Sequence, residues 1–432
     1  MSSTTSAAGV VSFESARHIV EQHAGLVSPG EVESVELLSA SGRVLAETLT
    51  ADRDFPPFHR AARDGYAVRA QDVAEVPSRL EVIGEIKAGD SPDASLRLKA
   101  RQAVSIMTGA ALPEGADAVV MVEYTAESGS AVEIKRSAKS TENFVPRGSE
   151  ARVGQMLVDR GTRLDHAVIA MAASVGKSRL QVFRRPRIAV LATGDEIVTI
   201  DETPGPAQIR NSNTYSLSVQ IQNAGGEPVP LPIAPDEPLR LKALIEEGLN
   251  SDLLLLAGGV SMGKYDLVEL VLAELKAEFY FTGAQIQPGR PAVFGSCGAD
   301  ILVRADDSST FSERSGTPAT QKYFFGLPGN PVSTMVTFEL FVRPMIQALS
   351  GAKPQPLIFL KARLKSDVRT KAGLKRFLPA VLSGEFENAE VELARWQGSG
   401  DIAAVTAANC YLVIPPDREL IAPGEWVSVF TR

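Results

Sequence analysis

The chain has 432 residues, enough for two to four domains at roughly 100–200 residues each. Hydrophobic residues make up 44% of it and charged residues 22%, which excludes a mainly disordered chain. The net charge is −8, and nonspecific nucleic-acid binders instead carry a basic surface that neutralises phosphates, so we expect no nucleic-acid partner.

Cysteine content and apolar run length exclude further classes of protein. Cys297 and Cys410 are the only cysteines, which excludes a disulfide framework and a thiolate zinc site. No apolar run reaches the ~20 residues of a membrane helix, so we expect no membrane partner. Residues 1–11 lack the basic start and long apolar core of a signal peptide. We therefore expect residues 1–11 to be a frayed terminus. Because no signal peptide is recognised, we also expect a cytoplasmic protein.

The first part of the chain predicts two helices around a small β region. Ser12 is a plausible N-cap for a helix that begins at Phe13, with apolar residues at helical spacing. A second helix is expected over Asp165–Gly176, with an Asp cap and a terminal glycine. Between them the sequence predicts a small, mostly β domain with strands at Leu80–Ile86, Ala103–Thr108, Ala118–Tyr124 and Ala131–Lys135.

After Arg184–Pro186 the pattern becomes strand, loop and helix in repetition. Uninterrupted apolar strands that alternate with helices predict a mostly parallel sheet covered on both faces. From Leu357 to Arg432 short strands and turns return, which predicts a second small β unit. The expected strands are Ile188–Ala192, Pro228–Ile233, Leu253–Ala257 and Tyr323–Phe325, and the expected helices are Asn211–Asn223, Pro235–Leu249, Tyr265–Lys276 and Val332–Leu349.

Three strand ends in this region carry loops of unusual composition: Thr193–Glu196, Gly258–Gly263 and Gly326–Pro331. In a doubly wound parallel sheet, ligands bind beyond the carboxyl ends of the strands. Two of the loops are glycine-rich and lead into helices, an arrangement that brings backbone N–H groups against a phosphate. Each loop alone could be an ordinary tight turn, but the three together favour an anionic ligand.

The same edge carries the carboxylates Asp195, Glu196, Asp236 and Asp266. Acids that face a phosphate-binding crevice favour a Mg²⁺ ion, which takes one or two carboxylates together with phosphate oxygens and water. The alternative for each residue is a helix cap or a first-turn acid that the helix dipole stabilises.

A basic residue and a small turn could complete an oxyanion pocket. The sequence Gln287-Pro288-Gly289-Arg290-Pro291 holds Arg290 in a stiff turn, and its guanidinium suits a tetrahedral oxyanion. In Trp396–Asp401, Ser399 lies between two glycines and could approach a ligand. The alternatives are a solvated turn arginine and an ordinary hairpin.

Read together, these segments closely resemble the molybdopterin molybdotransferase family, which includes bacterial molybdenum-insertion proteins and gephyrin-type E domains. The matching pieces occur in family order, and the likeness extends from about Phe13 to Val429. They are Pro57-Phe58 with Asp64–Arg69, Thr108-Gly109 with Gly115–Val120, Thr193–Glu196, Gly258–Gly263, Leu327–Ser333 and Gly398–Gly400.

The resemblance implies a multidomain α/β and β fold. The expected domains are an elongated linker and dimerisation domain, a small β domain, a central doubly wound, mostly parallel sheet domain of the molybdopterin-binding type, and a C-terminal β domain. It also implies an elongated homodimer whose cleft takes the β domain from the other subunit. The implied boundaries are 11–52 with 145–182 for the linker, then 53–144, 183–350 and 351–432.

The implied reaction is insertion of molybdate into adenylylated molybdopterin with Mg²⁺-dependent cleavage of the adenylate, which releases AMP and molybdenum cofactor. Further implied partners are a molybdopterin adenylyltransferase and the molybdoenzymes that receive the product. The family's positions transfer to this chain as follows: catalytic Asp266, Glu196, Asp64 and Thr108; substrate-binding Gly194, Gly258, Gly259, Ser261, Gly329 and Asn330; molybdate-binding Arg290, Pro291, Ser333, Arg376 and Ser399; metal-binding Asp195, Asp236 and Asp266.

Three segments depart from the family pattern. Arg60 and Arg63 add cations before Asp64, Gln287 replaces a lysine, and Glu150 replaces an aspartate. Two alternatives also remain at this point: a molybdopterin adenylyltransferase, because the sheet domain alone resembles that family, and a non-catalytic scaffold of the gephyrin type. The added β domains disfavour the first, and the intact acidic and basic positions disfavour the second.

Overall fold

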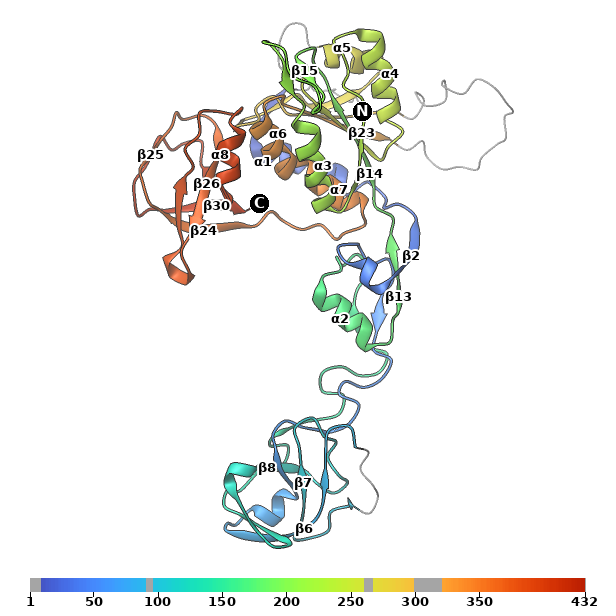
Figure 1. Ribbon diagram of the computed structural model, residues 1–432, viewed down its shortest axis with the longest axis vertical. Coiled ribbons are helices and arrows are strands. Elements are labelled where there is room, and N and C mark those ends of the chain that lie inside the picture. Colours follow the sequence, from blue (N-terminus) through green and yellow to red (C-terminus); the bar gives the residue numbers. More distant parts are fainter. Residues whose placement is uncertain (1–8, 91–95, 260–266, 299–320, 432) are drawn as a thin grey trace, which may run out of the picture.

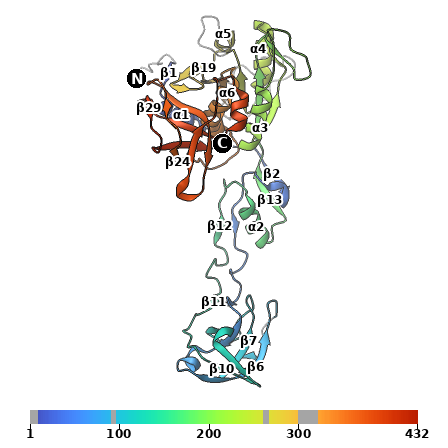
Figure 2. The same ribbon diagram turned by 60° about the vertical axis from the view of Figure 1, so that its left-hand side comes forward.

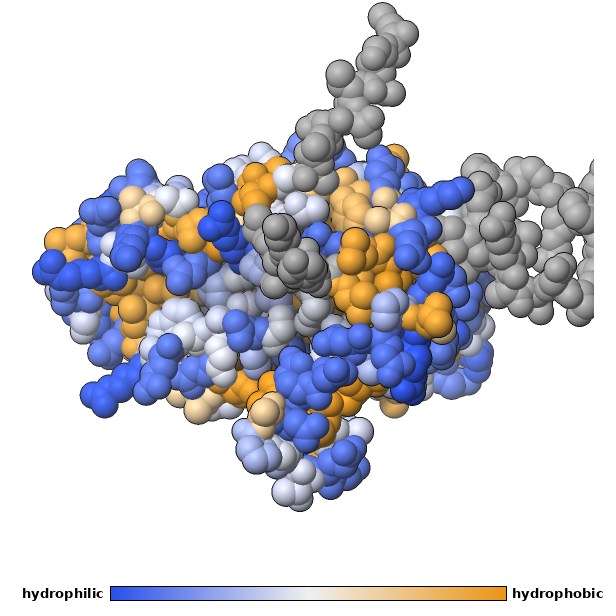
Figure 3. Space-filling view, turned by 90° about the horizontal axis from the view of Figure 1, so that it is seen from above, coloured by the Kyte–Doolittle hydropathy of each residue, from blue (hydrophilic) through white to orange (hydrophobic). Residues whose placement is uncertain are grey.

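The computed structural model describes residues 9–90, 96–259, 267–298 and 321–431. The chain forms an elongated molecule with a small β domain at one end, a narrow linker, and a sheet domain beside a C-terminal barrel at the other end (Figure 1). Within the described ranges no helix is long and apolar enough to cross a membrane. Seen from above, the broad end carries mostly hydrophilic side chains with separate hydrophobic patches between them (Figure 3).

The sheet domain contains six strands in the order β17-β14-β18-β23-β22-β19. The first four strands run parallel, as the sequence predicted, whereas β22 and β19 extend the sheet in antiparallel fashion. The strands are β14 (Arg187–Ala192), β17 (Glu227–Pro230), β18 (Leu253–Ala257), β19 (Glu278–Phe281), β22 (Val293–Cys297) and β23 (Lys322–Leu327).

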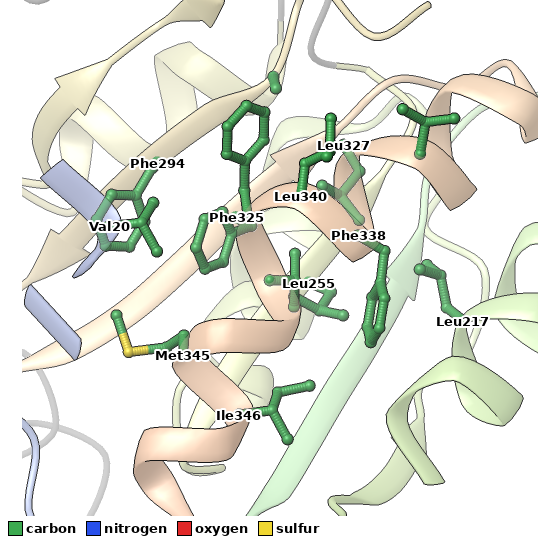
Figure 4. Packing of buried hydrophobic residues seen from close by; sticks show 14 of the residues in the cluster. Val20, Leu217, Leu255, Phe294, Phe325, Leu327, Phe338, Leu340, Met345 and Ile346 are labelled. Atoms are coloured by element: carbon green, nitrogen blue, oxygen red, sulfur yellow. The ribbon is translucent and has the colours of Figure 1, made fainter. Parts of the chain in front are cut away.

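Alternate side chains of β14 supply two separate cores, which is why its apolar run is continuous. Ile188 and Val190 pack with helices on one face, whereas Ala189 and Leu191 pack with helices on the other face. The first core is rich in aromatic side chains (Figure 4). The first face carries α3 (Asn213–Ala224), α6 (Pro331–Thr337) and α7 (Arg343–Leu349), and the second carries α4 (Pro238–Gly248) and α5 (Leu267–Glu274).

The helix predicted over Val332–Leu349 is interrupted. A π-helical turn at Phe338–Val342 separates α6 from α7, and all five of its side chains are buried. Glu339 lies in this turn and pairs with Arg343 at 2.6 Å. Pro344 lies within the predicted helix and lacks the backbone N–H that would donate to the carbonyl of Leu340, so the sequence carried a signal of the interruption that the apolar pattern obscured.

The N-terminal segment belongs to the sheet domain and not to the linker. Helix α1 (Phe13–Ala24) begins at the predicted Ser12 cap, and Phe13, Ala16 and Val20 are buried in the first core. Strand β1 (Val10–Val11) pairs with β20 (Gly283–Ala284). The expectations of a frayed end up to residue 11 and of a linker domain that starts there are therefore wrong at this point, because the hydrophobic face of α1 is covered by the sheet domain.

The linker consists of two distant chain segments that lie side by side (Figure 2). Its core is a small apolar cluster that includes Leu45, Leu49 and Leu180. The helix predicted near Asp165 is present, and Asp165 caps it. The elements are β2 (Val32–Glu36) paired with β13 (Arg179–Phe183), β3 (Leu49–Thr50) paired with β12 (Met156–Val158), and α2 (His166–Ser174).

The small β domain is one six-stranded sheet in the order β8-β5-β7-β6-β10-β9. Its two faces bury two separate apolar clusters, one around Tyr66 and one around Val104. The four predicted strands are present within three residues of their expected ends. The strands are β5 (Gly65–Val68), β6 (Ser78–Ile86), β7 (Gln102–Ile106), β8 (Ala118–Met121), β9 (Thr125–Ser128) and β10 (Ala131–Ile134), and β4 (Arg60–Ala61) pairs with β11 (Phe144–Val145) beside them.

The C-terminal domain is a closed five-stranded barrel. Its strands pair in a ring, β26-β27-β24-β30-β28 and back to β26. Strand β21 (Ile286–Gln287) of the sheet domain pairs with β26 and so joins the two domains. The elements are β24 (Phe359–Leu364), β26 (Lys375–Ser383), β27 (Glu390–Leu393), α8 (Ile402–Ala407), β28 (Cys410–Ile414) and β30 (Trp426–Thr431).

Candidate functional site

The described residues of the three predicted loops meet at the carboxyl edge of the sheet, because β14, β18 and β23 are neighbouring parallel strands. The Thr193 N–H donates to the carbonyl of Ala257 at 3.2 Å, and the Gly258 N–H donates to the carbonyl of Leu327 at 3.1 Å. These bonds extend the strand ladders by one residue into the loops. The loops are therefore held together by backbone contacts.

A cavity of about 350 Å³ lies among these loops, and we call it the loop pocket. Predicted residues Glu196, Gly258, Gly259, Gly329 and Asn330 line it. The sequence analysis missed several of the remaining lining residues, although the run Asn211-Ser212-Asn213 was a signal, since three small polar residues stand together at the start of a predicted helix. The missed residues are Ile197 and Ile209–Asn213, whereas Thr193, Pro328 and Pro331 belong to the predicted loops and Pro291 was predicted to bind molybdate.

Two glycines in the wall of the loop pocket cannot be replaced without strain. Gly258 has φ +99°, and a Cβ atom added to it would lie 2.7 Å from the carbonyl oxygen of Thr193. Gly259 has φ +63°, and its added Cβ would lie 2.6 Å from Thr193 Oγ1. The backbone therefore packs directly on Thr193, which only glycine permits at both positions.

Three of the four predicted carboxylates lie together at the rim. Asp195 Oδ1 accepts a hydrogen bond from the Asp236 N–H at 3.0 Å. The Glu196 carboxylate lies over Gly194, where an added Cβ would be 2.4 Å from Glu196 Oε2. Burial raises the pKa of the Asp236 carboxyl, and the charges of Asp195 and Glu196 raise this pKa further. The rim is thus an acidic cluster.

The described part of the chain holds no group of three His, Cys, Asp or Glu residues that could bind a metal ion by itself. Asp195 and Asp236, two of the predicted metal ligands, lie close together. The third, Asp266, lies outside the described residues, as does the predicted substrate residue Ser261. Two carboxylates suit an ion that takes its other ligands from substrate and water, as Mg²⁺ does.

A second cavity of about 640 Å³ lies between the sheet domain and the barrel, and we call it the arginine pocket. The side chain of Arg290 is exposed there, whereas Ser333 is buried in the first turn of α6. The Val332 N–H donates to the carbonyl of Ser399 at 3.0 Å, which seats the glycine-flanked turn on the start of this helix. The lining residues are Ile286–Pro291, Pro328, Asn330, Ser333, Leu374 and Trp396–Ser399.

Arg376 does not line the arginine pocket but lies directly behind it. Its Nη1 donates to the side-chain oxygen of Gln287, and its Nη2 donates to the carbonyl oxygen of Lys371. The residue is 6% exposed, and burial lowers the pKa of its guanidinium. No carboxylate in the described ranges forms an ion pair with it. Gln287, which the sequence analysis treated only as a lost cation, therefore connects Arg376 to the pocket wall.

The two pockets share Pro291, Pro328 and Asn330 in their walls, so they form one continuous crevice. Arg290 stands at one end of it and the acidic cluster at the other end. The expected juxtaposition of an acidic and a basic region is thus present for the residues that the structure describes.

Asp64 and Thr108 lie far from this crevice. They belong to the β domain, which lies at the opposite end of the elongated molecule (Figure 2). The Thr108 N–H donates to Asp64 Oδ1 at 2.6 Å. Hydrogen bonds from Thr108, first from its backbone and then from its hydroxyl, lower the pKa of the Asp64 carboxyl. Nearby, Arg60 pairs with Glu150 at 3.0 Å, so two of the departing positions partner each other.

Comparison with known proteins identifies the family. Residues 11–176 match the family described as the MoeA N-terminal region (domain I and II), residues 189–348 match the probable molybdopterin binding domain, and residues 361–431 match the MoeA C-terminal region (domain IV).

Full-length relatives show the same likeness. The molybdopterin molybdenumtransferase of Nostoc sp. is 34% identical over 413 residues, which cover 94% of this chain and 89% of the relative. The molybdopterin molybdenumtransferase of Bacillus subtilis is 33% identical over 409 residues, covering 93% and 90%. A crystal structure of the molybdopterin biosynthesis MoeA protein from Pyrococcus horikoshii OT3 matches with a TM-score of 0.76 at 28% identity, covering 98% of this chain and 100% of that chain. The chain therefore belongs to the MoeA family of molybdopterin molybdenumtransferases.

Proposed function

We propose that this protein inserts molybdate into adenylylated molybdopterin and releases AMP and molybdenum cofactor. The observation that carries the proposal is the continuous crevice, which joins a glycine-lined pocket with an acidic rim to a pocket with an exposed arginine. A substrate that contains both a phosphate bridge and a tetrahedral oxyanion needs both kinds of surface. The printed names of the full-length relatives support the same activity.

The loop pocket would bind the phosphate bridge of the substrate. Gly194, Gly258, Gly259 and Gly329 lie in loops whose backbone comes close to the cavity, and backbone N–H groups in such loops stabilise phosphate oxygens. Asn330 reaches both pockets and would contact substrate where they join. Ser261 is proposed as a substrate residue from the sequence alone.

The arginine pocket would hold molybdate. Arg290, Pro291, Ser333 and Ser399 line this cavity, so a charged fork, two hydroxyl groups and backbone groups converge on it. Arg376 would act from behind the wall, where its positive charge has no carboxylate partner in the described ranges. Two cations together favour an oxyanion over a neutral ligand.

Asp195 and Asp236, with Asp266, are proposed to hold a Mg²⁺ ion. The raised pKa of Asp236 supports this assignment, since carboxylates that repel one another gain from a shared cation. When bound, the ion would neutralise charge on the bridging phosphate. Glu196 lies next to this cluster and would orient the attacking oxygen nucleophile by accepting a hydrogen bond. Asp266 is proposed to position or activate that oxygen.

Asp64 and Thr108 are proposed to act in the crevice of a second copy of the chain. They cannot reach the crevice of their own subunit across the linker. The hydrogen bond from the Thr108 N–H orients the exposed Asp64 carboxylate, which would contact the crevice of another subunit. A homodimer would supply that contact. Proposed further partners are a molybdopterin adenylyltransferase and the recipient molybdoenzymes, and the proposed location is the cytoplasm.

The proposal is tested with purified protein, adenylylated molybdopterin, molybdate and Mg²⁺. We expect AMP release that requires molybdate. Asp266→Asn should retain the substrate but stop AMP release. Adenylation of free molybdopterin from ATP would instead indicate an adenylyltransferase, and inactivity in both assays would indicate a scaffold.

A further inference from the structure

Two buried oxygen atoms in residues that line the loop pocket have no hydrogen-bond partner in the part of the chain that the structure describes. They are Oγ1 of Thr193 and Oδ1 of Asn213. Thr193 is 2% exposed and Asn213 is 7% exposed, and neither oxygen is open to solvent. An unpaired buried polar atom destabilises the folded state, so a native protein rarely keeps one without a reason.

The orientation of the Asn213 amide is determined by its other end. Asn213 Nδ2 donates to the carbonyl oxygen of Gly329 at 2.8 Å. The amide oxygen is therefore left as an acceptor that needs a donor. Asn211, two residues earlier and also in the pocket wall, differs because both ends of its amide bond Thr214, at 2.9 Å and 3.1 Å. Asn211 thus stabilises the start of α3, whereas Asn213 has an unused acceptor.

Thr193 is held against the pocket by the glycine backbone described above. The close approach of Gly258 and Gly259 leaves its hydroxyl without an acceptor or donor from the described chain. Other buried threonines are paired. Thr337 Oγ1, for example, donates to the carbonyl oxygens of Ser333 at 2.8 Å and Thr334 at 3.1 Å. The unpaired hydroxyl is therefore a property of the pocket and not of buried threonines in this protein.

We propose that Thr193 and Asn213 are specificity-determining residues that bind a hydrogen-bond donor on the substrate, either a sugar hydroxyl or an exocyclic amine of a heteroaromatic base. A fully ionised phosphate carries no donor and cannot satisfy Asn213 Oδ1. The neutral, donor-bearing group of the substrate thus lies against Thr193 and the start of α3, next to the phosphate bridge that the glycine loops are proposed to bind. Because both oxygens are closed to solvent in the free protein, a ligand donor reaches them when side chains of the pocket wall shift on binding. This inference rests on the proposed function and adds the orientation of the substrate.

The binding test uses Thr193→Val, which removes the hydroxyl and keeps the shape, and Asn213→Ala. The probes are AMP and 6-hydroxymethylpterin, measured by calorimetry, with molybdate as the control ligand for the other pocket. We expect a loss of about 10-fold in affinity for one of the two organic probes, which identifies the source of the donor, and unchanged affinity for molybdate. Unchanged affinity of both variants for both probes, or no binding of either probe by the native chain, overturns the proposal.

A stability measurement distinguishes a ligand-binding hydroxyl from a structural one. Thr193→Val should raise the melting temperature of the free protein by about 2 °C, because it removes an unpaired buried hydroxyl. The matched control Thr337→Val should lower it by a similar amount, because it breaks existing bonds. A lowered melting temperature for Thr193→Val would show that its hydroxyl already has a partner and would overturn the proposal. Absence of AMP release by the native protein would refute the proposed function, but the probe affinities would still test this inference.

Discussion

The side-chain oxygen of Gln287 accepts a hydrogen bond from Nη1 of the buried Arg376. Gln287 lies in the wall of the arginine pocket, and Arg376 lies behind that wall in strand β26 of the barrel. The contact therefore joins two domains at the proposed molybdate site. Gln287 thus has a structural role, since its side-chain oxygen accepts a hydrogen bond from the guanidinium.

Gln287→Leu should raise the KM for molybdate about 10-fold and leave kcat nearly unchanged. Leucine keeps the volume but removes the acceptor that orients Arg376, so the oxyanion loses part of its positive surroundings. The measurement is AMP release as a function of molybdate concentration. Gln285→Leu is the matched control, because Gln285 is exposed on the same segment and does not line the pocket. Equal KM values for the two variants would show that Gln287 does not position Arg376.

Asp236→Asn should stabilise the free protein at pH 7 by about 0.5 kcal/mol, a small value because the residue is exposed. The pKa of the Asp236 carboxyl is higher in the folded protein than in the unfolded chain, where it is near 3.8. Ionisation of Asp236 therefore lowers the free energy of unfolding as the pH rises above about 3.8. The gain should therefore be present at neutral pH and disappear below about pH 4. Urea unfolding at several pH values measures it, with Asp201→Asn, another exposed aspartate, as control. A gain of equal size at all pH values would contradict the assignment.

Gly258→Ala should lower the free energy of unfolding by about 2 kcal/mol and abolish binding in the loop pocket. The added Cβ would require a disfavoured φ and would approach the Thr193 carbonyl to 2.7 Å. Gly298→Ala is the control, since an added Cβ there has no neighbour within 4 Å. Denaturant unfolding of the two variants, followed by AMP titration, checks the prediction. If the two variants are equally stable, the loop can relax and the packing argument is wrong.

Two inactive variants should complement each other if the crevice needs the β domain of a second subunit. Asp64→Asn and Arg290→Ala should each be inactive alone. After the two chains are unfolded, mixed in equal amounts and refolded, half of the dimers are mixed and each has one intact site, so about a quarter of the native activity should return. Refolded native protein is the reference. No recovery of activity, with mixed dimers shown to be present, would mean that both residues act within one subunit.

Local sequence patterns predicted much of the fold. The cap at Ser12, the alternating strands and helices of the sheet domain, and the strands of the β domain all follow from hydrophobic periodicity and turn residues. The docking of α1 on the sheet domain could not be predicted, because it depends on which other elements pack against this segment. The interruption of the long helix had a local signal in Pro344, which cannot continue the helical hydrogen bonds.

For the candidate site, too, some features follow from the sequence and others depend on tertiary packing. By itself, the sequence determined which loops lie at the carboxyl edge of the sheet and which acids and glycines they carry, because chain order and parallel pairing leave little freedom there. Only the tertiary structure decided that Arg376 is buried against Gln287, that Thr193 and Asn213 keep unpaired oxygens, and that Asp64 lies far from its own crevice. These relationships join residues from different domains or distant loops, and their distances depend on packing that no local pattern encodes.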